Sequence, residues 1–320
     1  MAFRFTKEFN KMITEERNAQ TMDLDLLDTN ELVSRVQNED FAVAEAVKQA
    51  IPDIAKAVDI ITEKLAAGGR LIYFGAGTSG RLGVLDATEC SPTFGIDTEL
   101  VTAHLAGGKE AMFRSFENAE DSQEMGTDDA VAAKITAADV VVGITASGRT
   151  PYVVGALTKA REAGAATIGI VNNFGGLDGL CDVTITAVVG AEALTGSTRM
   201  KAGTAQKMIL NLLTTCTMVR LGKVFENLMV DLKPTNEKLR ERAVSIISIL
   251  GEVPRHIAEG ALVASQNRAK TAILMTKKKL GRAHAEDLLT KAGGSLRKAL
   301  LAPTQLDQNP EKQTAESAPQ

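Results

Sequence analysis

The feature that most constrains this chain is a glycine-rich turn between a short apolar run and the start of a helix, at residues 70–83, RLIYFGAGTSGRLG. The aliphatic and aromatic run predicts a buried strand. The glycines permit a tight turn and let a ligand approach the backbone closely. Thr78 and Ser79 place hydroxyls and backbone N–H groups at a helix N-terminus, where an anion is favoured. The stretch therefore predicts a phosphate-binding loop.

The spacing of Gly75, Gly77 and Gly80 also fits a dinucleotide-binding fingerprint. That kind of site needs an acidic residue about 20 positions further on, at the end of the second strand. Here Asp97 and Glu99 come before the next apolar run and not after it. Because the acidic residues lie on the wrong side of the strand, we favour a phosphate loop over a dinucleotide site.

Composition and residue spacing argue against several classes of protein. A net charge of −4 with 4% aromatic residues argues against a nucleic-acid surface, and no apolar run is long enough to cross a membrane. The N-terminus lacks the apolar core of a signal peptide. The three cysteines and three histidines are widely spaced, so we expect neither a disulfide framework nor a metal centre. These features predict a cytoplasmic protein that acts on a small molecule.

Strands and helices alternate along most of the chain. The expected strands are 70–75, 100–105, 139–144, 165–171 and 183–189. The expected helices are 41–67, one that follows the glycine-rich turn and closes in a turn over 85–95, 109–121, 151–163, and one that follows Thr198 and ends at about 221. We expect Pro52 to start a second helix within the first of these ranges. This order predicts an α/β fold, a three-layer sandwich around a parallel sheet.

Domain limits follow from changes in this pattern. We expect an N-terminal segment at 1–40, a phosphate-binding domain at 41–232, and a helical region at 233–301 in which no strand pattern stands out. The last residues, 302–320, are polar and rich in Gln and Pro, which predicts disorder.

A second hydroxyl-bearing loop follows the strand at 139–144. Ser147 lies within it, and Thr150 followed by Pro151 is typical of a helix start, with Thr150 as the N-cap. Taken by itself, Thr150 is more simply interpreted as a helix cap than as a phosphate ligand. Two loops of this kind after parallel strands resemble the sugar isomerase (SIS) domain, which binds phosphosugars.

Four motifs in order extend the resemblance. They are GAGTSGR at 75–81, DATEC at 86–90, ASGRTPY at 146–152 and GSTRMKAGTAQK at 196–207. Together they resemble the N-acetylmuramic acid 6-phosphate etherase family over residues 12–300. Thr88 and Ser91 depart from the family pattern, which usually has Ser or Ala at the first position and Pro at the second. Of the two, we expect only Ser91 to bear on the chemistry, by altering a turn that aims Glu89.

The resemblance implies a carbon–oxygen lyase that removes the lactyl ether of a phosphosugar, with no metal or redox cofactor. It implies that Glu89 is the proton donor and Glu120 the second catalytic acid/base. It assigns the phosphate to Thr78, Ser79, Ser147 and Thr150. It also implies a homodimer, because SIS-type sites are commonly completed by a neighbouring subunit.

Two other functions remain open at this stage. A phosphosugar isomerase would use Glu192 or Glu120 to move a proton between C1 and C2, and a non-catalytic regulator would only sense the phosphosugar. Cys90 has no histidine near it in sequence, so we interpret it as a buried apolar residue and not a nucleophile. Arg199 and Lys201 are either surface charges or contacts to an anionic ligand.

Overall fold

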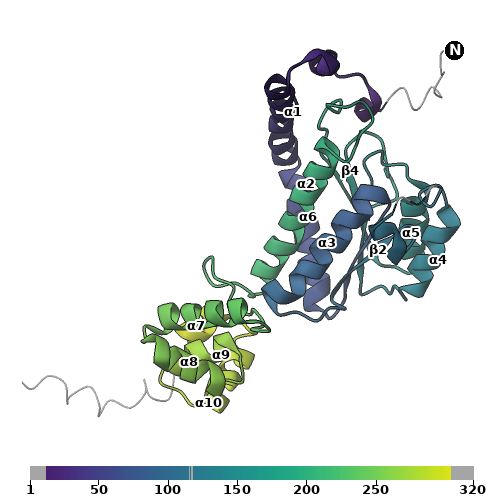
Figure 1. Cartoon of the computed structure of the whole chain (residues 1–320). Helices are drawn as coiled ribbons and strands as arrows, with labels where there is room; N and C mark the ends of the chain where they lie inside the picture. The colour runs from purple at the N-terminus through teal and green to yellow at the C-terminus, as the bar shows by residue number, and fades with distance from the viewer. Residues whose placement is uncertain (1–11, 115, 117, 304–320) are drawn as a thin grey trace, which may run out of the picture. The chain divides into compact units, whose positions relative to one another are not determined.

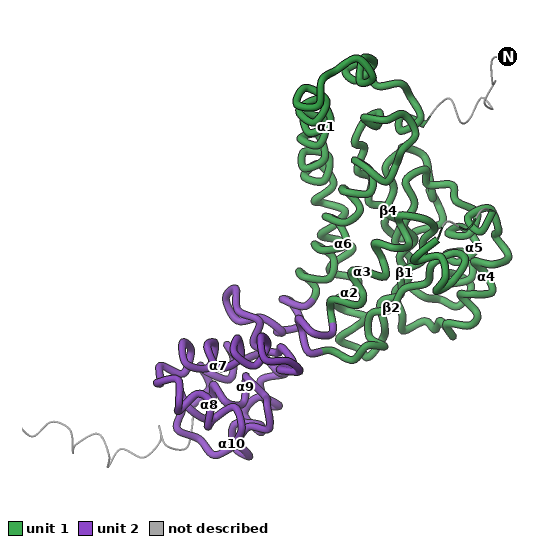
Figure 2. The backbone as a smooth tube through the Cα atoms, viewed as in Figure 1, with its two compact units in different colours: residues 1–90, 96–217 green, residues 91–95, 218–320 purple. Residues whose placement is uncertain are grey.

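The structure is a computed structural model that describes residues 12–114, 116 and 118–303; the segment 1–11 and most of the predicted tail lie outside it. The chain divides into two compact units, residues 1–90 with 96–217 and residues 91–95 with 218–320 (Figure 2). The domain limits expected from the sequence stay a prediction. No helix of the described part has both the length and the apolar character needed to cross a membrane.

A five-stranded parallel sheet forms the centre of the first unit. Its strands are β1 (Leu71–Gly75), β2 (Val101–Leu105), β3 (Val140–Ile144), β4 (Ala166–Val171) and β5 (Val183–Thr186), in the order β2-β1-β3-β4-β5. The chain reverses its direction of travel across the sheet between β1 and β3, where Gly75 pairs with Ile144. In open α/β sheets, ligands bind outside the carboxyl ends of the strands at this switch point.

Helices cover both faces of the sheet (Figure 1). On one face lie α4 (Gln123–Ala132) and α5 (Pro151–Glu162); on the other lie α2 (Ile51–Ala66), α3 (Gly77–Phe94) and α6 (Lys201–Arg220), with α1 (Thr29–Gln49) leading into α2. Alternate β1 side chains contact the two layers, since Phe74 packs against Tyr152 of α5 while the Tyr73 hydroxyl bonds to Asp86 of α3. The predicted three-layer α/β sandwich is confirmed.

Local chemistry explains where the first helices begin. The Asp28 carboxylate accepts the Glu31 N–H at 2.9 Å and caps α1. Pro52 occupies the first turn of α2, where its missing N–H leaves no helical bond unmade, so the prediction of a second helix there is confirmed.

Three expected helices differ from the structure. The first begins at Thr29 and not at residue 41. The helix expected over 109–121 is wrong: a short 3-10 helix, η5 (Lys109–Met112), is followed by turns and bends among the described residues. Asn118 has a φ of +67°, which a right-handed helix excludes. Glu120 therefore lies in a turn just before Ser122, which caps α4. The third, α3, is helical across most of the stretch expected to form a turn and continues through Pro92 to Phe94.

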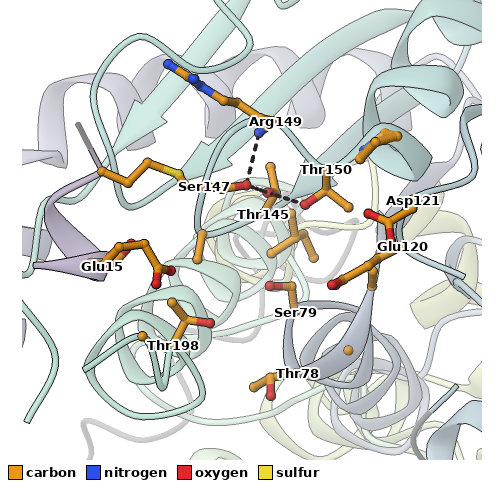
Figure 3. A pocket seen from close by; sticks show the side chains of 18 residues that line it. Glu15, Thr78, Ser79, Glu120, Asp121, Thr145, Ser147, Arg149, Thr150 and Thr198 are labelled. Atoms are coloured by element: carbon orange, nitrogen blue, oxygen red, sulfur yellow. Dashed lines mark hydrogen bonds between the residues drawn. The ribbon is translucent and has the colours of Figure 1, made fainter. Parts of the chain in front are cut away.

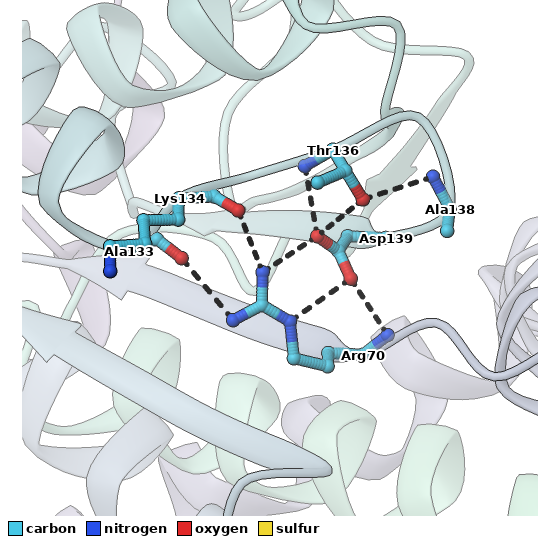
Figure 4. A network of polar contacts seen from close by, with 6 residues as sticks. All are labelled: Arg70, Ala133, Lys134, Thr136, Ala138 and Asp139. Atoms are coloured by element: carbon cyan, nitrogen blue, oxygen red, sulfur yellow. Dashed lines mark hydrogen bonds and ion pairs between the residues drawn. The ribbon is translucent and has the colours of Figure 1, made fainter.

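The opposite, amino-terminal edge of the sheet is fixed by Arg70 and Asp139 (Figure 4). The Arg70 side chain donates to both carboxylate oxygens of Asp139, at 3.1 and 2.7 Å, and to the carbonyls of Ala133 and Lys134. Asp139 also accepts the N–H and hydroxyl of Thr136. Burial alone would raise the pKa of Asp139, but the hydrogen bonds from Arg70 and Thr136 outweigh it and lower that pKa. The hydrogen bonds of this pair connect the starts of β1 and β3 with the end of α4.

The second unit is helical in its described part. It contains α7 (Glu237–Gly251), α8 (Arg255–Ala264), α9 (Ala269–Lys277), α10 (Arg282–Lys291) and α11 (Leu296–Leu301), packed around an apolar core. Lys270 is buried there, and its ammonium donates to Asp231 at 2.6 Å and to the Gly294 carbonyl at 2.8 Å.

Candidate active site

A cavity of about 510 Å³ opens at the carboxyl ends of β1 and β3 (Figure 3). It is lined by the loops that follow these two strands, by the turn at 120–121, by residues 196 and 198, and by the N-terminal segment 12–15. It thus lies at the switch point of the sheet, the expected position for a ligand in this architecture.

The first loop forms one wall. Thr78 and Ser79 lie in the first turn of α3, as the sequence predicted, and both line the cavity. A Cβ at Gly80 would lie 2.4 Å from the carbonyl oxygen of Gly75, so only glycine allows α3 to start this close to the end of β1. The free N–H groups of the first turn and the two hydroxyls therefore favour an anion at this point.

The second loop presents a chain of hydroxyls. The Thr145 hydroxyl bonds to that of Thr150 at 2.8 Å and to that of Ser147 at 3.2 Å, and it accepts the Gly148 N–H. Thr150 occupies the N-cap position of α5, as expected, but its side chain makes no capping bond. The simpler role that we gave Thr150 is therefore wrong, because its hydroxyl bonds to Thr145 at the cavity wall.

Glu120 enters from the turn before α4. The Tyr152 N–H donates to the Glu120 carbonyl at 3.1 Å and fixes this turn to the first turn of α5. The structure thus brings Glu120 into one cavity with Thr78, Ser79, Ser147 and Thr150.

Glu89 lies elsewhere. It is exposed on α3 and lines a separate hollow of about 280 Å³ with Asp86 and Lys207. Asp86 beneath it is buried and accepts the hydroxyls of Tyr73 at 3.0 Å and Thr214 at 3.1 Å. Burial raises the pKa of Asp86 to about 6 against the opposing effect of those hydrogen bonds. Within one chain, the structure does not join Glu89 to the other five predicted site residues.

Three residues with open roles are buried and structural. Glu192 does not line the cavity; its carboxylate accepts the N–H groups of Lys201 and Ala202, both at 2.9 Å, at the start of α6. Lys201 is 3% exposed and forms an ion pair with Glu39 at 2.7 Å. Burial raises the pKa of Cys90 to about 12, so its thiol stays protonated, in agreement with our interpretation. Glu192 therefore no longer supports an isomerase.

Sequence reasoning missed several polar residues that line the cavity: Glu15, Asp121, Thr145, Arg149 and Thr198. Arg149 and Thr198 lie within motifs that we had singled out. Glu15 lies in a polar stretch without periodicity, which offered no signal. Within the described residues, no group of His, Cys, Asp and Glu is arranged to hold a metal ion.

Comparison with known proteins identifies the family. Residues 53–161 match the glucokinase regulatory protein N-terminal SIS domain, and residues 110–216 match the SIS domain. The chain is 48% identical to the N-acetylmuramic acid 6-phosphate etherase of Clostridioides difficile, over 92% of this chain and 97% of that protein. The chain belongs to the N-acetylmuramic acid 6-phosphate etherase family.

Two other etherases are similar to this chain to the same extent. Identity is 50% to etherase 2 of Vibrio cholerae, over 90% of this chain and 94% of that protein. It is again 50% to the etherase of Salmonella typhimurium, over 90% of this chain and 98% of that protein. Because the matches extend over nine-tenths of the chain, the etherase family includes both structural units.

Proposed function

We propose that this chain is an N-acetylmuramic acid 6-phosphate etherase, a lyase that releases D-lactate and leaves N-acetylglucosamine 6-phosphate. The observation that carries this proposal is the cavity, where two hydroxyl-bearing loops and Glu120 meet in a chain of the etherase family. The first turn of α3 supplies N–H groups for the phosphate, and Thr78, Ser79, Ser147 and Thr150 supply hydroxyls.

Two carboxyl groups suffice for the elimination and the addition of water that follow ring opening. Direct hydrolysis of an ether is slow because the leaving alkoxide is strongly basic. Once the sugar has opened to its aldehyde, the C2 proton becomes acidic and the C3 oxygen leaves by elimination. Glu120 removes the C2 proton, Glu89 protonates the departing lactate, and water then adds at C3. The two glutamates must hold different protonation states.

The position of Glu89 supports the involvement of a second copy of the chain. Along α3, the ten residues from Ser79 to Glu89 correspond to roughly 15 Å of helix, which exceeds the span of one hexose phosphate. The hollow that Glu89 lines is also lined by Leu85, an apolar side chain that is 47% exposed. We infer that the enzyme is a cytoplasmic homodimer in which Glu89 of each copy completes the cavity of the other.

An assay of the purified protein with N-acetylmuramic acid 6-phosphate tests the activity. We expect D-lactate and N-acetylglucosamine 6-phosphate in equal amounts. An isomerase would give a ketose phosphate and no lactate, and a regulator would bind the phosphosugar without changing it. Either of these results would reject the proposed function.

A further inference from the structure

Glu15 belongs to the N-terminal segment, far in sequence from the two hydroxyl-bearing loops, and its position is fixed by its neighbour Thr14. The Thr14 N–H donates to the Asn173 side chain at 3.4 Å, and the Asn173 amide donates back to the Thr14 hydroxyl at 2.9 Å. The Gly196 N–H donates to the Thr14 carbonyl at 3.2 Å. Since Thr14 is 1% exposed, the short 3-10 helix η2 (Ile13–Glu15) is firmly attached to the cavity rim.

The Glu15 carboxylate fills a space that a glycine leaves open. A Cβ at Gly196 would lie 2.8 Å from Oε2 of Glu15, and the φ of Gly196 is +74°, which also favours glycine. Figure 3 shows the side chains of Glu15 and Glu120 directed into the cavity from opposite walls. Asp121 lies beside Glu120, so Glu15 is the one carboxylate on its wall among the described residues that line this cavity.

The carboxylate is also available for chemistry. Among the described residues it has no hydrogen-bond or ion-pair partner, and it is half-buried. Burial raises the pKa of Glu15 above its usual value, which is the direction that suits a group that both accepts and donates a proton. The other charged groups that line the cavity are Glu120, Asp121 and Arg149.

We propose that Glu15 is the catalytic acid–base that opens the pyranose ring before elimination. The inference rests on the proposed function, because the C2 proton becomes acidic only when C1 is an aldehyde. In this step the C1–O5 bond breaks and the C1=O1 bond forms. The proton leaves O1 and a proton arrives at O5, so the carboxyl group returns to its starting state. Glu120 stays free to act at C2 from the opposite wall.

Anomer exchange of N-acetylglucosamine 6-phosphate tests this step without any lactate chemistry. Magnetisation transfer between the α and β anomers reports ring opening directly. We expect the wild-type protein and Glu16→Gln, an exposed neighbour outside the cavity, to accelerate the exchange above the spontaneous rate. We expect Glu15→Gln to lose this acceleration while still binding the sugar phosphate. Full acceleration by Glu15→Gln would overturn the proposal.

A substrate that is already open separates ring opening from the later steps. On N-acetylmuramic acid 6-phosphate, Glu15→Gln should lower kcat by roughly 10²–10⁴-fold with little change in KM. On the open-chain 2,3-unsaturated aldehyde 6-phosphate, it should add water at nearly the wild-type rate. Equal losses on both substrates, or a rise in KM alone, would overturn the proposal. Absence of lactate release by the wild-type protein would reject the proposed function instead, whatever Glu15→Gln does to anomer exchange.

Discussion

Ser79 and Glu89 lie on the same helix, α3, yet they line different cavities of the first unit. If the phosphate binds at Ser79, Glu89 of that chain lies too far along the helix to reach C3 of the same sugar. The proposed second copy would resolve this, because a two-fold interface that brings Glu89 of one copy to the cavity of the other also does the reverse.

Hybrid dimers test the exchange of Glu89 between copies. Glu89→Gln and Glu120→Gln should each be inactive alone. When the two variants are mixed after subunit exchange, about a quarter of the wild-type activity should return, because half the dimers are hybrids and each hybrid has one intact site. Sedimentation should show dimers in all samples. No recovery in proven hybrids would place Glu89 and Glu120 in the same chain's site.

The phosphate assignment predicts the effect of losing single hydroxyls. Ser79→Ala and Ser147→Ala should each weaken binding of N-acetylglucosamine 6-phosphate by roughly 1–3 kcal/mol, because each removes a hydrogen bond to a charged group. Thr88→Ala is a matched control, since its exposed hydroxyl only bonds backbone carbonyls of its own helix. Calorimetric titration measures all three. Unchanged affinity in both serine variants would show that the phosphate binds at another place.

The sequence predicted most of the fold because its signals were local. Apolar runs predicted all five strands, and Pro52 predicted the start of α2. The helix expected over 109–121 failed because a tertiary contact prevailed over propensity: the Arg81 side chain binds the carbonyls of Ala111 and Arg114, which a continuing helix would use itself.

Much of the site was also predictable, because each loop follows a strand and opens a helix. The hydroxyls of both loops therefore lie close together at the carboxyl edge of the sheet. Glu15 was not predictable in this way. Its place depends on Asn173 and Gly196, which lie more than 150 positions further along the chain. Only a folded chain brings these residues together.

The pair Arg70–Asp139 predicts a loss of stability without a loss of chemistry. Asp139→Ala should lower the free energy of unfolding by roughly 3–5 kcal/mol, because it leaves the partly buried Arg70 guanidinium without its carboxylate. Glu162→Ala is the control, since it removes an exposed pair with Lys159 and should cost at most about 1 kcal/mol. Urea unfolding measures both. Equal effects of the two substitutions would contradict the structural role of Asp139.

Asp86 predicts how stability depends on pH. The raised pKa, about 6 against 3.8 in the unfolded chain, means that the native state keeps a proton that the unfolded state has lost. The contribution of Asp86 is therefore fully present below pH 3.8 and is lost as pH rises through 6, by about 3 kcal/mol in all. Asp86→Asn cannot titrate at this position. Its free energy of unfolding, taken relative to that of the wild type, should therefore rise between pH 4 and pH 7. A constant difference between the two proteins across that range would exclude this titration.

The most direct test of the central claim is the reaction in ¹⁸O-labelled water. The account predicts that the wild-type protein releases D-lactate without label and forms N-acetylglucosamine 6-phosphate with the label at the C3 oxygen, because the bond broken is on the sugar side. Mass spectrometry of both products reads this in one experiment. Label in the lactate, or no lactate at all, would contradict the account.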